Sequence, residues 1–145
     1  MSYHLLNTDG GMVNDGKRNH GDPCGEAAVA VVLSQVKNDK ERVIEAFSGA
    51  IGLATNAEAE YQALIEGLHF AFHQEHATDI RVFVDAEYVA DHLTGHSKVG
   101  DNLRGLHADA KGLLEKFNSH RISWVPRERN QTADLLVRAI LYPGE

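Results

Sequence analysis

Residues 56–85 read NAEAEYQALIEGLHFAFHQEHATDIRVFVD, and this stretch decides the fold. The apolar side chains of residues 56–76 recur with the period of a helix, and one face carries Tyr61, Leu64, Ile65, Leu68 and Phe72. Thr55 or Asn56 can cap this helix. The apolar run 80–84 has the length of a strand and ends at Asp85. A helix that leads into such a strand predicts a right-handed crossover between parallel strands.

A second acidic residue, Asp9, follows a short apolar run and precedes Gly10 and Gly11. Glycines favour a turn, so we expect a strand to end at Asp9. Parallel neighbours have their C-terminal ends at the same edge of a sheet, and Asp9 and Asp85 are therefore predicted to lie close together.

Helical acids can reach the same edge. Asp134 lies in the first turn of a predicted C-terminal helix, beside its apolar stripe. In the helix at 56–76, Glu58 and Glu60 lie at opposite edges of the apolar arc. Periodicity alone does not choose between these two glutamates.

The remaining segments complete an α/β pattern. Residues 10–25 are rich in glycine, asparagine and aspartate and predict a long loop. The apolar runs 27–36 and 43–53 predict a hairpin. Further elements are expected as helices at 86–93 and 103–117, a strand at 122–125 that stops at Pro126, and a final helix capped by Asn130.

Length and composition bound the class of protein. At 145 residues we expect one domain, residues 1–145, and a monomer. The formal net charge of −7 argues against a surface that binds nucleic acid everywhere, because such affinity comes from lysine and arginine. A local site remains compatible with this charge if divalent cations lie between acidic groups and phosphates.

The cysteine count and the apolar runs of the sequence also predict the cellular compartment of the protein. The single cysteine, Cys24, cannot form an intrachain disulfide, and we expect it to be a small loop residue. No apolar run near Met1 has the length of a signal peptide or a membrane span. We therefore expect a soluble, cytoplasmic protein without a membrane partner.

An ordered set of motifs carries a family resemblance. The motifs are TDGG (8–11), GDPCG (21–25), ATNAEAEYQALIEGL (54–68), VDAEYV (84–89), LTGHSKV (93–99) and WVPRERNQTADLL (124–136). Together they closely resemble type I ribonuclease H, in the form found in archaeal and many bacterial chains. The resemblance implies a ribonuclease H-like α/β fold, a five-stranded mixed sheet with helices on both faces. It also implies an enzyme, a metal-dependent endoribonuclease that cuts the RNA strand of RNA/DNA hybrids.

The resemblance further implies a site of four carboxylates with two Mg²⁺ or Mn²⁺ ions: Asp9, Glu60, Asp85 and Asp134. Glu60 is chosen over Glu58 because the family's glutamate falls five residues after Thr55 and directly before Tyr61. Asp9 would bridge both ions, Glu60 and Asp85 would hold the ion on the leaving-group side, and Asp134 would hold the ion that activates water. The products would carry 3′-hydroxyl and 5′-phosphate ends.

Substrate contacts are implied at several positions, with 2′-hydroxyl groups distinguishing RNA from DNA. The candidates are Gly10, Gly11, Asn56, Arg127, Arg129 and Asn130, and further basic groups for phosphate contact are Lys17, Arg18, Lys98 and Arg104. Glu128, in the loop before the last acid, is a candidate for proton transfer, and its alternative interpretation is a solvated loop charge.

Some positions depart from the family pattern. Ala57 stands where the family has a second asparagine, Ala86 where a serine is usual, and Asp22 where asparagine precedes proline; residues 14–20 lengthen the loop. The lost amide and hydroxyl groups bear on substrate binding more than on metal binding. They favour, as the alternative, a catalytically silent module that binds nucleic acid or a protein.

Several residues also have purely structural interpretations. Asp9 can be a turn residue, Asp85 a helix cap, and Glu60 and Asp134 first-turn acids that the helix dipole favours. His69, His73 and His76 have helical spacing compatible with zinc, but we favour a solvated face. Trp124 is expected in the core.

Overall fold

The structure is a computed structural model that describes residues 1–14, 16–19 and 21–144. Asp15 and His20, which belong to the predicted loop, lie outside the described residues, as does Glu145. The strands are β1 (Ser2–Met12), β2 (Lys17–Asn19), β3 (Asp22–Lys37), β4 (Lys40–Thr55), β5 (Asp79–Val84) and β6 (Ser119–Trp124). The helices are α1 (Asn56–His73), α2 (Glu87–Thr94), α3 (Arg104–Leu114) and α4 (Gln131–Leu141), with 3₁₀ turns at Asp101–Leu103 and Arg127–Arg129.

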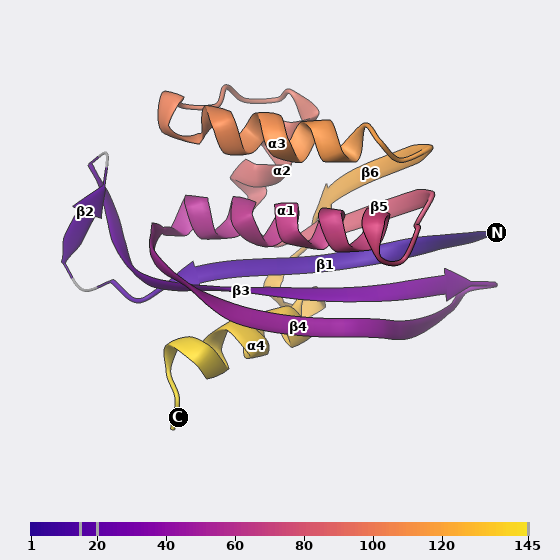
Figure 1. Cartoon of the computed structure of the whole chain (residues 1–145), viewed down its shortest axis with the longest axis horizontal. Coiled ribbons are helices and arrows are strands. Elements are labelled where there is room, and N and C mark those ends of the chain that lie inside the picture. The colour runs from indigo at the N-terminus through magenta and orange to yellow at the C-terminus, as the bar shows by residue number, and fades with distance from the viewer. Residues whose placement is uncertain (15, 20, 145) are drawn as a thin grey trace.

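The described strands form one mixed sheet in the order β2-β3-β1-β5-β6, and β4 pairs with β3 (Figure 1). β1 is antiparallel to β3 and parallel to β5, and β5 is parallel to β6. The parallel pairing predicted for the strands before Asp9 and Asp85 is therefore confirmed. The five predicted strands are present, and β2 adds a short sixth one within the segment predicted to be a loop.

Helices cover both faces of the sheet, as predicted: α1, α2 and α3 lie on one side and α4 on the other (Figure 1). The alternation of side chains along β3 explains this arrangement. Val31 and Leu33 join the core under α1, whereas Ala30 and Val32 pack against Val137 of α4. The central part of β3 thus has two apolar faces, and each requires a helical cover.

The prediction that β1 ends at Asp9 is wrong. β1 continues through Gly10 and Gly11 to Met12, which pairs with Ala27 of β3. The reason is steric: a Cβ on Gly10 would lie 2.3 Å from the backbone carbonyl carbon of Ala59 in α1. Glycine here allows a helix to cross close to a strand and does not make a turn.

Two other side chains lie elsewhere than predicted. Trp124 is 48% exposed, because it ends the edge strand β6, and its indole Nε1 donates a hydrogen bond to the backbone carbonyl of Asp85 at 3.2 Å. Cys24 is a buried free thiol within β3 and is not a loop residue. Across the ranges described, no helix has both the length and the apolar character that a membrane span requires.

Candidate metal centre

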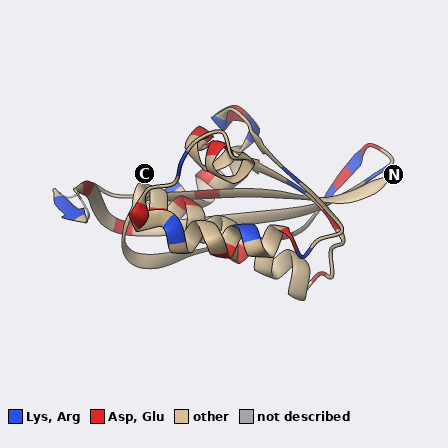
Figure 2. Ribbon diagram, turned by 90° about the horizontal axis from the view of Figure 1, so that it is seen from above, with Lys and Arg blue, Asp and Glu red and all other residues tan. Residues whose placement is uncertain are grey.

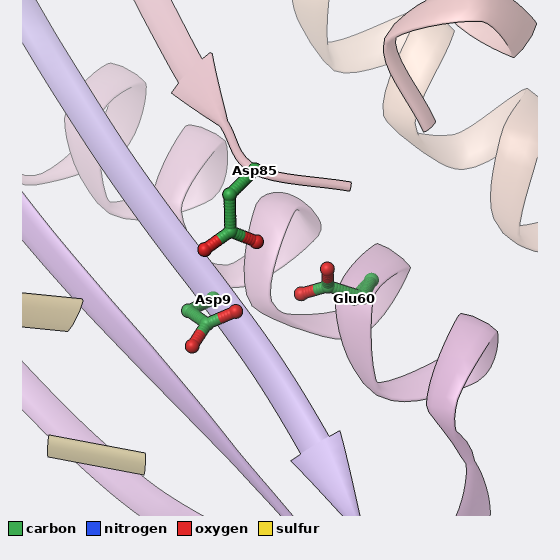
Figure 3. A group of neighbouring side chains, drawn as sticks. All are labelled: Asp9, Glu60 and Asp85. Carbon is green, nitrogen blue, oxygen red and sulfur yellow. The ribbon is translucent and has the colours of Figure 1, made fainter. Parts of the chain in front are cut away.

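Three acidic side chains meet at one edge of the sheet. Asp9 lies in β1, Glu60 near the start of α1, and Asp85 directly after β5, and their carboxyl groups point toward one another (Figure 3). One carboxylate oxygen of each lies within 4.8 Å of the others. The register of the parallel pair places Thr8 beside Val84, so the next residues in each strand, Asp9 and Asp85, become neighbours.

The structure distinguishes Glu60 from Glu58. The Glu58 carboxylate accepts a hydrogen bond from the Thr55 backbone N–H at 2.8 Å, and the Thr55 hydroxyl accepts one from Glu58 N at 3.1 Å. This reciprocal capping box commits Glu58 to the start of α1. Glu60 is 8% exposed and is the glutamate that faces Asp9.

The close crossing at Gly10 orients Glu60. The backbone N–H of Gly10 donates a hydrogen bond to Oε1 of Glu60. This contact requires α1 to lie almost against β1, which the missing side chain of Gly10 allows. The glycine therefore fixes the distance between the strand that carries Asp9 and the helix that carries Glu60.

Burial and the repulsion between neighbouring carboxylates raise the pKa values of Asp9 and Glu60. Burial raises the pKa of Asp9 to about 7, and the negative charge of Asp85 adds to the rise. The pKa of Glu60 is also raised, first by burial and then by the charge of Asp9. Among the described residues, no lysine or arginine forms an ion pair with the three carboxylates. Closely spaced carboxylates without a basic partner suit a hard divalent cation such as Mg²⁺ or Mn²⁺, which prefers oxygen ligands.

The raised pKa of Asp9 predicts a pH-dependent stability of the metal-free protein. The folded state holds this proton up to about pH 7, whereas an unfolded chain releases it near the ordinary pKa of 3.8. Protonation therefore favours the folded state, and this stabilisation is lost as the pH rises from the ordinary pKa to the raised one.

We expect thermal unfolding in chelator to occur at a lower temperature at about pH 8 than at about pH 5. The difference should shrink in Asp9→Asn, which has no carboxyl group to titrate. Saturating Mg²⁺ should also reduce it, because a cation replaces the proton. Equal pH dependence in Asp9→Asn and the parent chain would show that Asp9 does not titrate in this range.

Asp134 lies near the trio but outside it. It is half-buried in the first turn of α4, and its charge contributes to the raised pKa of Asp9 after burial and the charge of Asp85. Arg127, Glu128 and Asp134 line one shallow cavity of about 390 Å³, together with Gln131 and Leu135. The exposed loop before α4 thus brings both signs of charge beside the fourth predicted acid.

The predicted substrate residues differ in exposure. Asn56, Arg127 and Arg129 are exposed, and the Arg129 guanidinium lies 5.3 Å from the centre of the Phe83 ring. Gly10 is buried, Gly11 is half-buried and Asn130 is only 2% exposed. Asn130 occupies the N-cap position of α4 as predicted, but its side chain makes no capping hydrogen bond.

Sequence reasoning missed Tyr88. Its hydroxyl oxygen is buried, and burial raises the pKa of this phenol, with a further contribution from the charge of Glu60. The position was visible in the sequence, since Tyr88 follows Asp85 by three residues, within the first turn of α2.

The histidines of α1 lie away from the acids. The rings of His69 and His73 have centroids 4.3 Å apart, near the end of the helix opposite to Glu60. In the part of the chain that the structure describes, these two and His76 form no group with the geometry of a metal site.

Comparisons with known proteins identify the family. A family model described as "Reverse transcriptase-like" matches residues 14–140. The crystal structure of RNase H1 from Halobacterium salinarum superposes with a TM-score of 0.80 at 34% identity, covering 95% of this chain and 96% of that one. The chain belongs to the type I ribonuclease H family.

Two curated ribonuclease H relatives are longer than this chain. Ribonuclease HI of Halobacterium salinarum is 39% identical over 126 residues, which are 83% of this chain and 59% of that protein. Bifunctional protein Rv2228c of Mycobacterium tuberculosis is 36% identical over 122 residues, 83% of this chain and 32% of that protein. The chain thus spans less than two thirds of either one. A further ribonuclease H structure, LC11-RNase H1 in complex with an RNA/DNA hybrid, has a TM-score of 0.76 at 26% identity.

Proposed function

We propose that this chain is a metal-dependent endoribonuclease that cuts the RNA strand of RNA/DNA hybrids. The observation that carries the proposal is the convergence of Asp9, Glu60 and Asp85 within 4.8 Å. Two neighbouring structures add support, because one is an RNase H1 and the other an RNase H1 bound to an RNA/DNA hybrid. The four acids would hold two Mg²⁺ or Mn²⁺ ions, and Asp9 would be a ligand of both.

Each side chain has a proposed role. Glu60 and Asp85 would hold one ion, on the leaving-group side, and Asp134 would hold the other, which would activate water. Two ions bound there would supply a nucleophile from water near neutral pH and relieve negative charge on the leaving oxygen, giving 3′-hydroxyl and 5′-phosphate ends. We propose that Glu128, which is exposed and lines the cavity beside Asp134, exchanges a proton with solvent on that side.

We propose that the protein binds the hybrid through a few local contacts. Figure 2 shows lysine and arginine dispersed among acidic residues along the ribbon and not gathered over one face. We propose that the exposed Arg127 and Arg129 contact phosphates and that Asn56 and Gly11 lie along the bound strand. Monomeric state and cytoplasmic location stay predictions from the sequence.

The direct test compares matched RNA/DNA, RNA/RNA and DNA/DNA duplexes of one sequence, each with Mg²⁺, Mn²⁺ or chelator. We expect cleavage of the RNA strand of the hybrid alone, and only with a divalent cation. Cleavage of the double-stranded RNA at an equal rate would reject the proposed substrate.

A silent module is the second candidate, because Ala86 supplies no hydroxyl group at the start of α2, where the resemblance implies a serine for substrate binding. Such a module has no reason to bind divalent cations at the acids. No cleavage of any duplex, combined with no heat of Mg²⁺ binding in calorimetry, would establish it.

A further inference from the structure

Asn130 connects the structural elements that carry the proposed metal ligands. We propose that it is a positioning residue, which holds the Asp85 carboxylate and joins it to the helix of Asp134, and that it does not contact substrate. The proposal rests on the proposed function, because it concerns the geometry of the same acids.

The contacts of its side chain point to the acid site. Nδ2 of Asn130 donates hydrogen bonds to the carbonyl oxygen of Thr8 at 2.9 Å and to Oδ2 of Asp85 at 3.3 Å. Oδ1 accepts a hydrogen bond from Nδ2 of Asn7 at 3.0 Å. One amide therefore joins β1, directly before Asp9, to the carboxylate that follows β5.

The orientation of this amide follows from its partners. The carbonyl oxygen of Thr8 can only accept, and an ionised Asp85 carboxylate can also only accept, so the NH₂ end of Asn130 must face both. The opposite end then presents its oxygen to the Asn7 amide, which donates. Only the side-chain amide of asparagine or glutamine offers two N–H donors on one atom and an acceptor oxygen on another, and asparagine is the shorter of the two.

The backbone of Asn130 extends the connection to the fourth acid. Its carbonyl oxygen accepts a hydrogen bond from the backbone N–H of Asp134 at 3.1 Å. A shift of Asn130 would therefore move Asp85 and the first turn of α4 together. Trp124 supports the same segment from the other side through its hydrogen bond to the Asp85 carbonyl.

The burial of the Asn130 side chain distinguishes a positioning role from contact with substrate. Only 2% of Asn130 is exposed, so a nucleic acid strand on the surface cannot reach its amide. Groups that orient a metal ligand from behind it typically change metal affinity or activity by about 10–100-fold when they are replaced. That range sets the effect expected here.

The test replaces Asn130 by aspartate, which keeps the shape and puts an oxygen where the donor was. We expect Asn130→Asp to weaken Mg²⁺ binding in calorimetry by about 10-fold or more and to lower kcat to a similar degree. Hybrid affinity, measured in chelator, and KM should stay within about twofold of the parent, since the amide does not touch substrate. Asn118→Asp, exposed in the turn before β6, is the control for the added charge and should match the parent.

Other outcomes would overturn the proposal. Weaker hybrid binding in chelator with unchanged Mg²⁺ affinity would make Asn130 a substrate contact. A folded Asn130→Asp variant with unchanged Mg²⁺ affinity and kcat would show that Asn130 does not position the metal ligands. If the parent protein neither binds Mg²⁺ nor cuts the hybrid, the proposed function is wrong, and the role of Asn130 that rests on it is rejected with it.

A second variant is available if Asn130→Asp does not fold. Trp124→Phe removes the other hydrogen bond to the Asp85 segment at an exposed position, so folding is not at stake. We expect a smaller loss of Mg²⁺ affinity, roughly threefold, with hybrid affinity in chelator unchanged. Full Mg²⁺ affinity in this variant would contradict control of Asp85 by its hydrogen-bonded neighbours.

Discussion

Replacing Asp9 by asparagine is expected to lower hybrid cleavage by about 10³-fold or more, because several kcal/mol of charge stabilisation depend on the bound cations. In the proposed site Asp9 would be the one acid that contacts both ions, so an amide in its place should weaken both positions. The fold should persist, since an amide matches the carboxyl group in size. The metal-free variant should even unfold at a higher temperature than the parent at about pH 8, where the buried carboxylate is charged.

The control for Asp9→Asn is Asp109→Asn, which makes the same chemical change at an exposed position in α3. Cleavage of a labelled hybrid by this control should equal that of the parent. An Asp9→Asn variant that cuts as fast as the parent would show that the carboxylate is not a metal ligand needed for the reaction.

Replacing Gly10 by alanine is expected to destabilise the fold strongly. The added Cβ would lie 2.3 Å from both the carbonyl carbon and the oxygen of Ala59 and 2.6 Å from the nitrogen of Glu60. These are backbone atoms, which cannot turn away as a side chain can. We expect a loss of about 3 kcal/mol or more in the free energy of unfolding, at the upper end for overpacked sites.

Cleavage should fall together with stability in Gly10→Ala, because α1 must move away from β1 and carry Glu60 away from Asp9. Chemical denaturation measures the stability, and hybrid cleavage at a temperature where the variant is folded measures the activity. Gly49→Ala, in β4 with no atom within 4 Å of an added Cβ, is the matched control and should be nearly neutral. A Gly10→Ala variant of parental stability would contradict the close crossing of α1 and β1.

The local pattern of apolar residues was sufficient to predict that Asp9 and Asp85 lie close together. The apolar run before Asp85 and the helix before that run allow one simple connection, and parallel strands then bring both acids to one edge. The family resemblance supplied Glu60, and the structure gives the physical reason, since the capping box occupies Glu58.

Long-range contacts explain what the sequence did not predict. Gly10 looked like a turn residue because its role depends on Ala59, which lies far along the chain. The side chain of Asn130 looked like a helix cap because its partners, Thr8 and Asp85, are distant in sequence. Trp124 is apolar enough for the core, but its place at the end of an edge strand leaves it exposed.

The most direct test of the four-carboxylate site is an anomalous scattering map of the parent protein. The protein would be crystallised with Mn²⁺ and a hybrid whose RNA strand cannot be cleaved. We expect two Mn²⁺ peaks about 4 Å apart. Asp9, Glu60 and Asp85 should contact one of them, and Asp9 and Asp134 the other. A bound hybrid with no Mn²⁺ peak at Asp9 would contradict a metal site formed by the four carboxylates.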